Sequence, residues 1–369
     1  MPDDLPRIPK KRGPRNKPRD VAWIQQELSA YRPLYTFRCA IPLVSILSFC
    51  CLAISIAFYK SSLKGFELEV DYTDCEKQIC DYELKLPEIQ GQVLFFYGMR
   101  GFHQNMRKYQ QSRNDRQLAR HLRETDECYP FQCLDTEGKP STCKGDQKVP
   151  IVPCGAVANS IFNDTFKLFY HNGPPELPIR EVPLTTAGLL HPSFRSQKYR
   201  NPKKCTDENS FCGSNCTAKC PGFESTAKPP WWPKPIAEIG DVDTGWALEN
   251  FDFIQWMETS ALPNFRKIWR RLNQQSGSPF ASGLPASNYT LRIVYNYPVR
   301  GYSARKLFVI QSDGPLGPKA EFQIFAFFCV GFFLLVFSAF MVIIEFAPGI
   351  TQRLRRCLSY FQSPEISGL

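Results

Sequence analysis

The hydrophobic and polar positions divide the chain into two long apolar runs with a more polar region between them. Residues 39–59 and residues 322–344 contain no charged residue. Each run exceeds the roughly 20 residues that an α-helix needs to cross about 30 Å of hydrocarbon. A buried core helix of this length normally carries a polar face. The pattern therefore predicts two transmembrane helices, the second of which extends to residue 346.

A cleaved signal peptide is the alternative for the first run, because small residues suited to cleavage occur at Ala53, Ser55 and Ala57. The apolar run is longer than the roughly 7–15 apolar residues of a signal peptide. It is also preceded by 38 residues. A retained membrane anchor is the better interpretation.

Basic residues flank the two runs and predict their orientation. Residues 1–38 contain nine Lys and Arg against four acids, and residues 347–369 contain three Arg against one Glu. Positively charged segments stay on the cytoplasmic side of a membrane. Both termini are therefore predicted to be cytosolic, and residues 60–321 to form a lumenal or extracellular ectodomain.

Within the second run, three residues suggest contacts. Glu345 at its inner end is expected to be interfacial and solvated, and a contact with a partner helix is the less favoured alternative. Gly331 and Ser338 lie seven residues apart and suit a small-residue contact face. The nine Phe of residues 322–346 are expected to face lipid or the helices of another protein.

Between the two apolar runs, the hydrophobic residues occur in shorter segments. Residues 92–99, 289–299 and 306–312 are rich in aromatic and β-branched residues, which predicts strands. Residues 248–273 show apolar positions at helical spacing. Because Pro263 interrupts them, they predict two short helices.

Other stretches are less regular. Residues 103–123 are polar and basic, and they predict an exposed helix or a long hairpin excursion. Residues 173–235 are rich in Pro, Lys and turn residues, which predicts long loops stapled by disulfides over a β core. Residues 21–32 predict a short amphipathic helix that ends before Pro33, at the inner membrane face.

Cysteines and sequons support the predicted topology. Ten of the fifteen Cys lie between the two runs, which indicates up to five disulfides in an oxidising compartment. A zinc site at the last four is disfavoured, because they lack paired C-x-x-C knuckles. Three N-x-S/T sequons lie in the same region, where glycosylation is possible. The candidate disulfide residues are Cys75, Cys80, Cys128, Cys133, Cys143, Cys154, Cys205, Cys212, Cys216 and Cys220, and the candidate glycosylation sites are Asn163, Asn215 and Asn288.

The distribution of charge and the absence of catalytic motifs restrict the possible classes of function. The net charge of +10 comes mainly from the predicted tails, so it is a topology signal and not evidence for nucleic-acid binding. The chain has four His and contains no H-E-x-x-H, G-x-S-x-G or G-x-x-x-x-G-K-[ST] motif, which argues against an ectoenzyme. Three classes stay open: an accessory subunit of a larger membrane protein, a two-span ligand-gated channel, and a lipid or lipoprotein receptor. The channel is disfavoured because neither run carries a polar stripe.

A fourteen-residue motif carries the strongest functional signal. Residues 153–166, PCGAVANSIFNDTF, closely resemble the signature of the accessory (β) subunits of type IV P-type ATPases, the cell-division-cycle-fifty or ligand-effect-modulator family. Residues 23–36, WIQQELSAYRPLYT, are similar to the family's QQxLxAxxPxxT pattern. The resemblance spans residues 21–347. Further similar blocks follow in the family's order: FFYGMRGFHQNMRKYQQSRNDRQL (95–118), WWPKP (231–235), ENFDFIQWMETSALPNFRKIWR (249–270) and YNYPV (295–299).

The resemblance implies a membrane protein in which two transmembrane α-helices flank a large disulfide-bonded, mainly antiparallel β ectodomain with long loops and a few short helices. The implied function is that of a non-catalytic subunit, without cofactor or metal, of a ten-span ATPase that moves phospholipid from the exoplasmic to the cytosolic leaflet. Such subunits support the ATPase's phosphorylation cycle and accompany it out of the endoplasmic reticulum, toward the Golgi, endosomes and plasma membrane. The expected boundaries are 1–38 for the basic tail, 39–59 and 322–346 for the helices, 60–321 for the ectodomain and 347–369 for the second tail.

The resemblance also assigns roles to particular residues. Cys128 and Cys154 match a disulfide pair of the family, and Cys75 with Cys80 imply one small loop. Cys133 with Cys143, like the four Cys from 205 to 220, look like additions to the family's pattern. A mainly structural role is favoured for the signature, in which Gly155 permits a tight turn; contact with the ATPase is the alternative. The candidate interface residues are Gln25, Gln26, Pro33, Asn159, Ser160 and Asp164.

Overall fold

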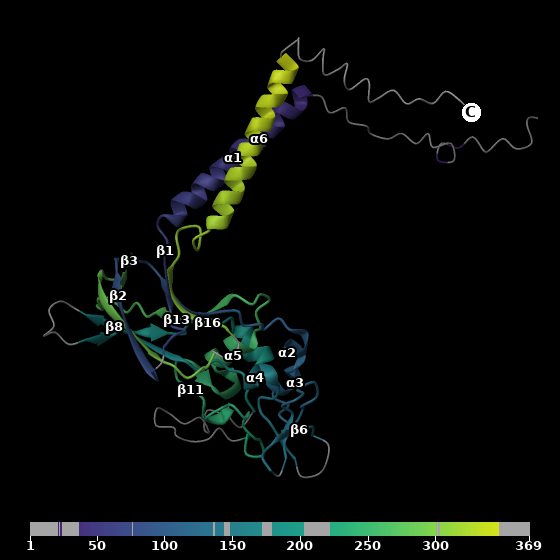
Figure 1. Cartoon of the computed structure of the whole chain (residues 1–369), viewed down its shortest axis with the longest axis vertical. Coiled ribbons are helices and arrows are strands. Elements are labelled where there is room, and N and C mark those ends of the chain that lie inside the picture. Colours follow the sequence, from purple (N-terminus) through teal and green to yellow (C-terminus); the bar gives the residue numbers. More distant parts are fainter. Residues whose placement is uncertain are drawn as a thin grey trace, which may run out of the picture. The chain divides into compact units, whose positions relative to one another are not determined.

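Two long helices and a β-rich region account for the described part of the chain (Figure 1). Residues 56–324 form one structural unit, and segments from both ends of the chain form the other. The computed structural model describes residues 21, 23, 37–75, 77–135, 137–143, 148–171, 179–202, 222–299, 301 and 303–346.

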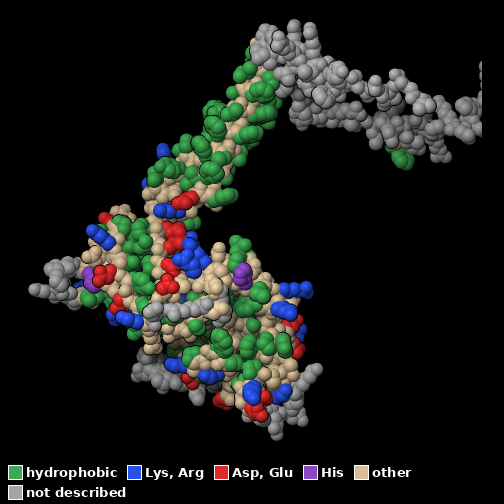
Figure 2. Space-filling view, in the orientation of Figure 1, with side chains coloured by type: hydrophobic (Ala, Val, Ile, Leu, Met, Phe, Trp, Pro, Cys, Tyr) green, Lys and Arg blue, Asp and Glu red, His purple; other side chains and the backbone are tan. Residues whose placement is uncertain are grey.

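The long helices are α1, Phe37–Ser62, and α6, Glu321–Phe346, with 26 residues each. Both are long and apolar enough to cross a membrane, and they contain the two apolar runs predicted from the sequence. Many of their large apolar side chains are exposed, and Figure 2 shows these side chains covering the helices. Such a surface suits contact with lipid or with the helices of a partner.

A seam of polar and small residues joins α1 to α6. Both helices contribute positions seven residues apart, which is the spacing of a coiled-coil seam. The small-residue face expected on the second run thus contacts this chain's own first helix. Glu345, expected to be solvated, instead forms an ion pair within the seam. The contacts are Arg38 Nε to Glu345 Oε1 at 2.9 Å, Ser45 Oγ to Ser338 Oγ at 2.6 Å, and Ser48 Oγ to the Gly331 carbonyl at 2.8 Å.

The main sheet of the β-rich unit has five antiparallel strands in the order β1-β16-β4-β13-β10. The first strand after α1 and the last strand before α6 are neighbours in it. The strands are β1, Phe66–Asp71; β4, Val93–Arg100; β10, Leu184–Thr185; β13, Phe265–Leu272; and β16, Arg305–Ser312.

A second antiparallel sheet has the order β2-β15-β8-β9, and three small sheets complete the described strands. The strands of the second sheet are β2, Ile79–Leu86; β8, Thr165–His171; β9, Arg180–Glu181; and β15, Ser287–Val294. The small sheets pair β3, Ile89–Gln90, with β14, Gly283–Leu284; β5, Cys133–Leu134, with β6, Pro140–Ser141, and β7, Val149–Pro150; and β11, Gly240–Asp241, with β12, Gly245–Trp246.

Short helical segments connect the sheets; among the α-helices, α4 lies within the signature, and α2, α3 and α5 contact it. They are α2, Arg107–Gln111; α3, Asp115–Leu118; α4, Ala156–Asn159; α5, Phe251–Met257; the π-helix η1, Phe194–Lys198; and the 3-10 helices η3, Ile236–Glu238, and η4, Ala247–Glu249.

A large hydrophobic core fills the β-rich unit, and a smaller separate cluster contains Cys128, Ile151 and Cys154. On β4, the buried residues Phe95, Tyr97 and Met99 alternate along the strand, as expected for one face of a sheet. Phe308 and Ile310 of β16 belong to the same core. The predicted fold class is confirmed: two apolar helices flank a mainly antiparallel β region with few short helices.

The three strand predictions are confirmed as β4, β15 and β16, although β15 ends at Val294. The first helix predicted within residues 248–273 is also present, as α5. The second helix was a wrong prediction, because residues 265–272 form β13. This segment pairs with β4, so that Phe265 and Trp269 pack against the core.

The prediction for residues 103–123 was also wrong in its extent. The segment forms neither a long exposed helix nor a hairpin, but the two short helices α2 and α3. Gln117 and Leu118 of α3 are buried. These two inward side chains anchor the segment, which explains why its periodicity is weak.

Candidate functional site

The signature segment, residues 153–166, begins at a buried disulfide between Cys128 and Cys154. This is the pair that the family resemblance implies. Gly155 follows with a φ of +96°, and a Cβ at this position would lie 2.0 Å from the carbonyl oxygen of Ser112. Only glycine tolerates both this positive φ and this close approach of the Ser112 backbone. The expected tight turn therefore requires glycine at position 155.

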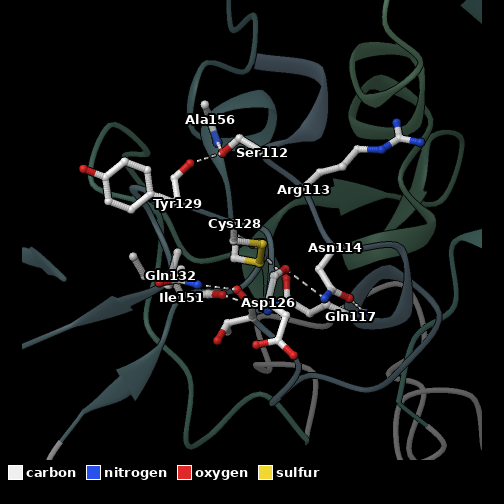
Figure 3. The surroundings of a disulfide bond; sticks show 12 residues. Ser112, Arg113, Asn114, Gln117, Asp126, Cys128, Tyr129, Gln132, Ile151 and Ala156 are labelled. Atoms are coloured by element: carbon white, nitrogen blue, oxygen red, sulfur yellow. Dashed lines mark hydrogen bonds between the residues drawn. A yellow bond between two sulfur atoms is a disulfide. The ribbon is translucent and has the colours of Figure 1, made fainter. Parts of the chain in front are cut away.

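Two polar side chains hold the segment around this disulfide (Figure 3). The Ser112 hydroxyl donates to the Tyr129 carbonyl at 2.6 Å and accepts the Ala156 amide at 2.8 Å. The buried Gln117 side chain accepts the Cys154 amide at 2.8 Å and donates to the Ile151 carbonyl at 2.9 Å. Buried backbone groups on both sides of the turn are therefore satisfied by side chains.

The α4 helix within the signature is held by two buried indoles. Trp256 Nε1 donates to the Val157 carbonyl at 2.9 Å, and Trp232 Nε1 donates to the Ala158 carbonyl at 2.8 Å. The carbonyls at the end of a helix have no partner within the helix, and these donors satisfy two of them. The Asn159 side chain accepts the backbone amide of Trp231, the residue before Trp232, at 3.2 Å.

Ser160 is half-buried and directs its hydroxyl toward α2. Its Oγ lies 2.8 Å from the hydroxyl of Tyr109. Burial raises the pKa of Tyr109 to about 12, so the tyrosine stays neutral at physiological pH. The pair joins α2 to the residue that ends α4.

A buried ion pair lies at the other end of the signature. Asp164 Oδ2 is 2.6 Å from the Nζ of Lys306, and both side chains are 0% exposed. Asp164 also accepts the Tyr72 hydroxyl at 3.1 Å and the backbone amides of Asn296 and Tyr297 at 2.6 and 2.7 Å. One carboxylate thus connects the end of β1, the signature, the YNYPV block and β16.

The surroundings of this ion pair shift two pKa values. Burial lowers the pKa of Lys306 to about 8, against the opposing effect of the Asp164 charge. Burial, and then the Asp164 charge, raise the pKa of Tyr72 well above its usual value. Lys306 Nζ also donates to the Tyr297 carbonyl at 2.7 Å, so its charge is compensated by hydrogen bonds as well as by the carboxylate.

A second buried lysine, Lys267 of β13, holds the end of α5. Its Nζ donates to the carbonyls of Gln255 at 2.7 Å, Trp256 at 3.3 Å and Glu258. A cation at a helix C-terminus is favourable because the carbonyls there carry partial negative charge. Burial nevertheless lowers the pKa of Lys267 to about 7, and the Glu258 charge opposes this shift.

Sequence reasoning missed both buried lysines, although the alternation of the strands contains a signal for each. Lys306 shares its strand face with Phe308 and Ile310, and Lys267 shares its face with Phe265. An inward lysine requires a buried partner. The partners lie elsewhere in the sequence and could not be found by local pattern.

The structure places only some of the predicted site residues. Asn288 is exposed on β15, and Asn163 is half-buried with its carbonyl accepting from the Asn296 side chain at 3.0 Å. Glycosylation stays a prediction. The described residues contain three disulfides: Cys75–Cys80, Cys128–Cys154 and Cys133–Cys143. The candidates outside the described residues are Gln25, Gln26, Pro33, Cys205, Cys212, Cys216, Cys220 and Asn215.

Three candidate interface residues lie within the described part of the chain. Asn159 and Asp164 are buried, and Ser160 is bonded to Tyr109. Their side chains serve contacts within the chain, which favours a structural role for the signature. Among the described residues, no group of three or more His, Cys, Asp and Glu is arranged to hold a metal ion.

Two apolar terminal helices flanking a disulfide-bonded antiparallel β region define a two-pass membrane protein. Residues 30–349 match the model of the LEM3 (ligand-effect modulator 3) family / CDC50 family, and the chain belongs to this family.

The chain is similar to both animal and fungal proteins. The chain is 33% identical to human cell cycle control protein 50B, over 90% of this chain and 94% of that protein. It is 35% identical to mouse cell cycle control protein 50C, over 71% and 74% of the two chains. It is 28% identical to a protein of Chaetomium thermophilum named phospholipid-transporting ATPase accessory subunit CDC50, over 77% and 65%.

Proposed function

We propose that this chain is a non-catalytic accessory subunit of a type IV P-type ATPase that moves aminophospholipid from the exoplasmic to the cytosolic leaflet. Family membership over residues 30–349 carries this proposal, together with the similarity to the Chaetomium protein named as a phospholipid-transporting ATPase accessory subunit. The two apolar helices supply an anchor beside the helices of the ATPase. The chain forms a heterodimer with the catalytic subunit, which holds the nucleotide.

The subunit acts as a clamp on that ATPase. Its helices pack beside the ATPase's helices, its β-rich unit covers the exoplasmic loops, and residues 21–38 contact the cytosolic face. Binding on both sides of the membrane stabilises the transport-competent conformations, because a ligand shifts an equilibrium toward the states that it binds more tightly. The buried ion pair and the α1–α6 seam support this role, since a rigid surface loses little entropy on binding.

The clamp also serves folding and export. Covering the lumenal surface of a partly folded ATPase hides apolar groups from retention systems in the endoplasmic reticulum. The complex then moves to the Golgi, endosomes and plasma membrane, with both termini of this chain in the cytosol. The excess of basic residues in the two tails supports this orientation.

Co-purification tests the proposal. A tagged chain is expressed in its native cells and isolated in mild detergent, and the bound proteins are identified by mass spectrometry. We expect a type IV P-type ATPase whose ATP hydrolysis is stimulated by aminophospholipid. Absence of any P-type ATPase would refute the proposal.

Matched glycine variants test whether recovery of the ATPase requires a correctly folded signature. Gly155→Ala places a Cβ against the Ser112 carbonyl, whereas Gly301→Ala meets no atom within 4 Å. We expect the Gly301 variant to recover as much ATPase as the parent chain. The Gly155 variant should recover much less, because its signature turn cannot form.

A further inference from the structure

Two turns lie together where the β-rich unit continues into α1 and α6. The hydroxyl of Ser61, in the last turn of α1, accepts the backbone amide of Leu316 at 2.8 Å. Gly314 and Gly317 exchange backbone hydrogen bonds of 2.9 and 3.0 Å, which close the second turn. A Cβ on Gly314 would lie 2.2 Å from the Ser61 carbonyl oxygen. Residues 61–65 and 313–318 are thus held in close backbone contact.

These turns present apolar side chains beside basic ones. Leu63 is 68% exposed and Leu316 is 54% exposed. The lysines at 60, 64 and 319 are also exposed, and none takes part in an ion pair of the described residues. The nearby acids are Asp313, whose carboxylate accepts from Gln311 at 2.6 Å, and Glu321 at the start of α6. Exposed leucines with exposed lysines close by in the sequence are typical of a membrane interface.

The position of Leu63 along α1 gives its depth. It follows Tyr59, the last residue of the apolar run, by four residues, and its amide donates to the Tyr59 carbonyl at 3.1 Å. At about 1.5 Å per residue, Leu63 lies roughly 6 Å beyond the end of the run. The headgroup layer of one leaflet is about 5–7 Å thick. Leu63 therefore lies within this layer if α1 crosses the membrane, and Leu316 is held at the same level through Ser61.

We propose that residues 60–65 and 313–319 form a membrane foot that inserts into the headgroup layer of the leaflet on the side of the β-rich unit. Leu63 and Leu316 contact the boundary of the acyl chains. Lys60, Lys64 and Lys319 bind the phosphate groups of bilayer phospholipids, while their methylene chains cover the apolar surface. The proposal requires that α1 and α6 cross a membrane, but it does not depend on an ATPase partner.

Tryptophan fluorescence of the reconstituted full chain tests the foot. Leu63→Trp and Leu316→Trp are compared with Val242→Trp, because Val242 is an apolar residue that is 87% exposed on the turn between β11 and β12. The chains are placed in phosphatidylcholine vesicles with bromine at the upper acyl positions, and the parent signal is subtracted. We expect the added fluorescence to be quenched at least three-fold more at residues 63 and 316 than at 242. Equal quenching at the three positions would overturn the proposal.

Two further measurements separate the parts of the proposal. Replacing Lys60, Lys64 and Lys319 by Gln in the Leu316→Trp chain should lower the quenching at least two-fold, because the phosphate contacts are lost. Unchanged quenching would overturn the role of the lysines. If quenching by lipid is strong for the chain alone but is lost in a purified complex with its membrane partner, the foot is a protein contact and the lipid assignment is wrong.

Discussion

Replacing Lys306 by Met should destabilise the β-rich unit strongly. The variant removes a fully buried ammonium 2.6 Å from Asp164 and leaves the carboxylate with the Tyr72 hydroxyl and two backbone amides. Removing one partner of a buried ion pair costs about 3–5 kcal/mol. At about 2–4 °C per kcal/mol for a unit of this size, Tm should fall by roughly 6–20 °C.

The assay is thermal unfolding of the full chain in detergent, followed by tryptophan fluorescence. Lys167→Met is the matched control, because Lys167 pairs with Glu181 at 3.4 Å on the exposed side of β8. Exposed pairs contribute about 0–1 kcal/mol, so this Tm should change by less than about 4 °C. The Asp164→Asn/Lys306→Met double variant should lose less stability than the two single variants combined, because no unpaired charge stays buried. Equal losses for the two lysine variants, or strict additivity in the double variant, would contradict the reasoning.

Three other changes have defined outcomes. Gly155→Ala should lower Tm well below that of Gly301→Ala, and equal melting temperatures would contradict the close contact at Ser112. Lys267→Met should remove a pH dependence of the free energy of unfolding. The pKa of Lys267 is about 7 in the folded chain and about 10.4 in the unfolded chain, so the unfolded chain binds more protons between these values and stability rises with pH there. Urea titrations at pH 6.5 and 9 should therefore show this rise in the parent chain and a smaller one in the variant. Gly331→Leu should separate α1 from α6, since a Cβ there lies 2.8 Å from Leu52 Cγ, and an unchanged cross-linking yield between the helices would refute this.

Local sequence patterns predict helices and strands correctly where the type of element does not depend on contacts with distant segments. The two apolar runs and the strands β4, β15 and β16 follow from length, charge and β-branched composition alone. The helix predicted after Pro263 was wrong, because the four basic residues at 266, 267, 270 and 271 suit the exposed surface of a helix as well as a strand. The strand form of this segment is set by β4 and β10 on either side, and these contacts with distant segments override local propensity.

The site was predictable only in part for the same reason. Gly155 and the pairing of Cys128 with Cys154 were available from the family resemblance. The partners of Asp164 were not, because Tyr72 and Lys306 lie 92 and 142 residues away. The contacts of α4 with Trp232 and Trp256, 74 and 99 residues downstream, were hidden in the same way.

Because the signature side chains point into the chain, the effects of signature variants on stability must be separated from their effects on partner binding. Changes at Gly155, Asn159 or Asp164 act first on the fold, because these residues touch the chain itself. Loss of a partner after such a change would accompany loss of stability and would not by itself locate an interface. Exposed positions such as Trp231 can separate the two effects, since a variant there that keeps Tm but loses the partner must act on contact.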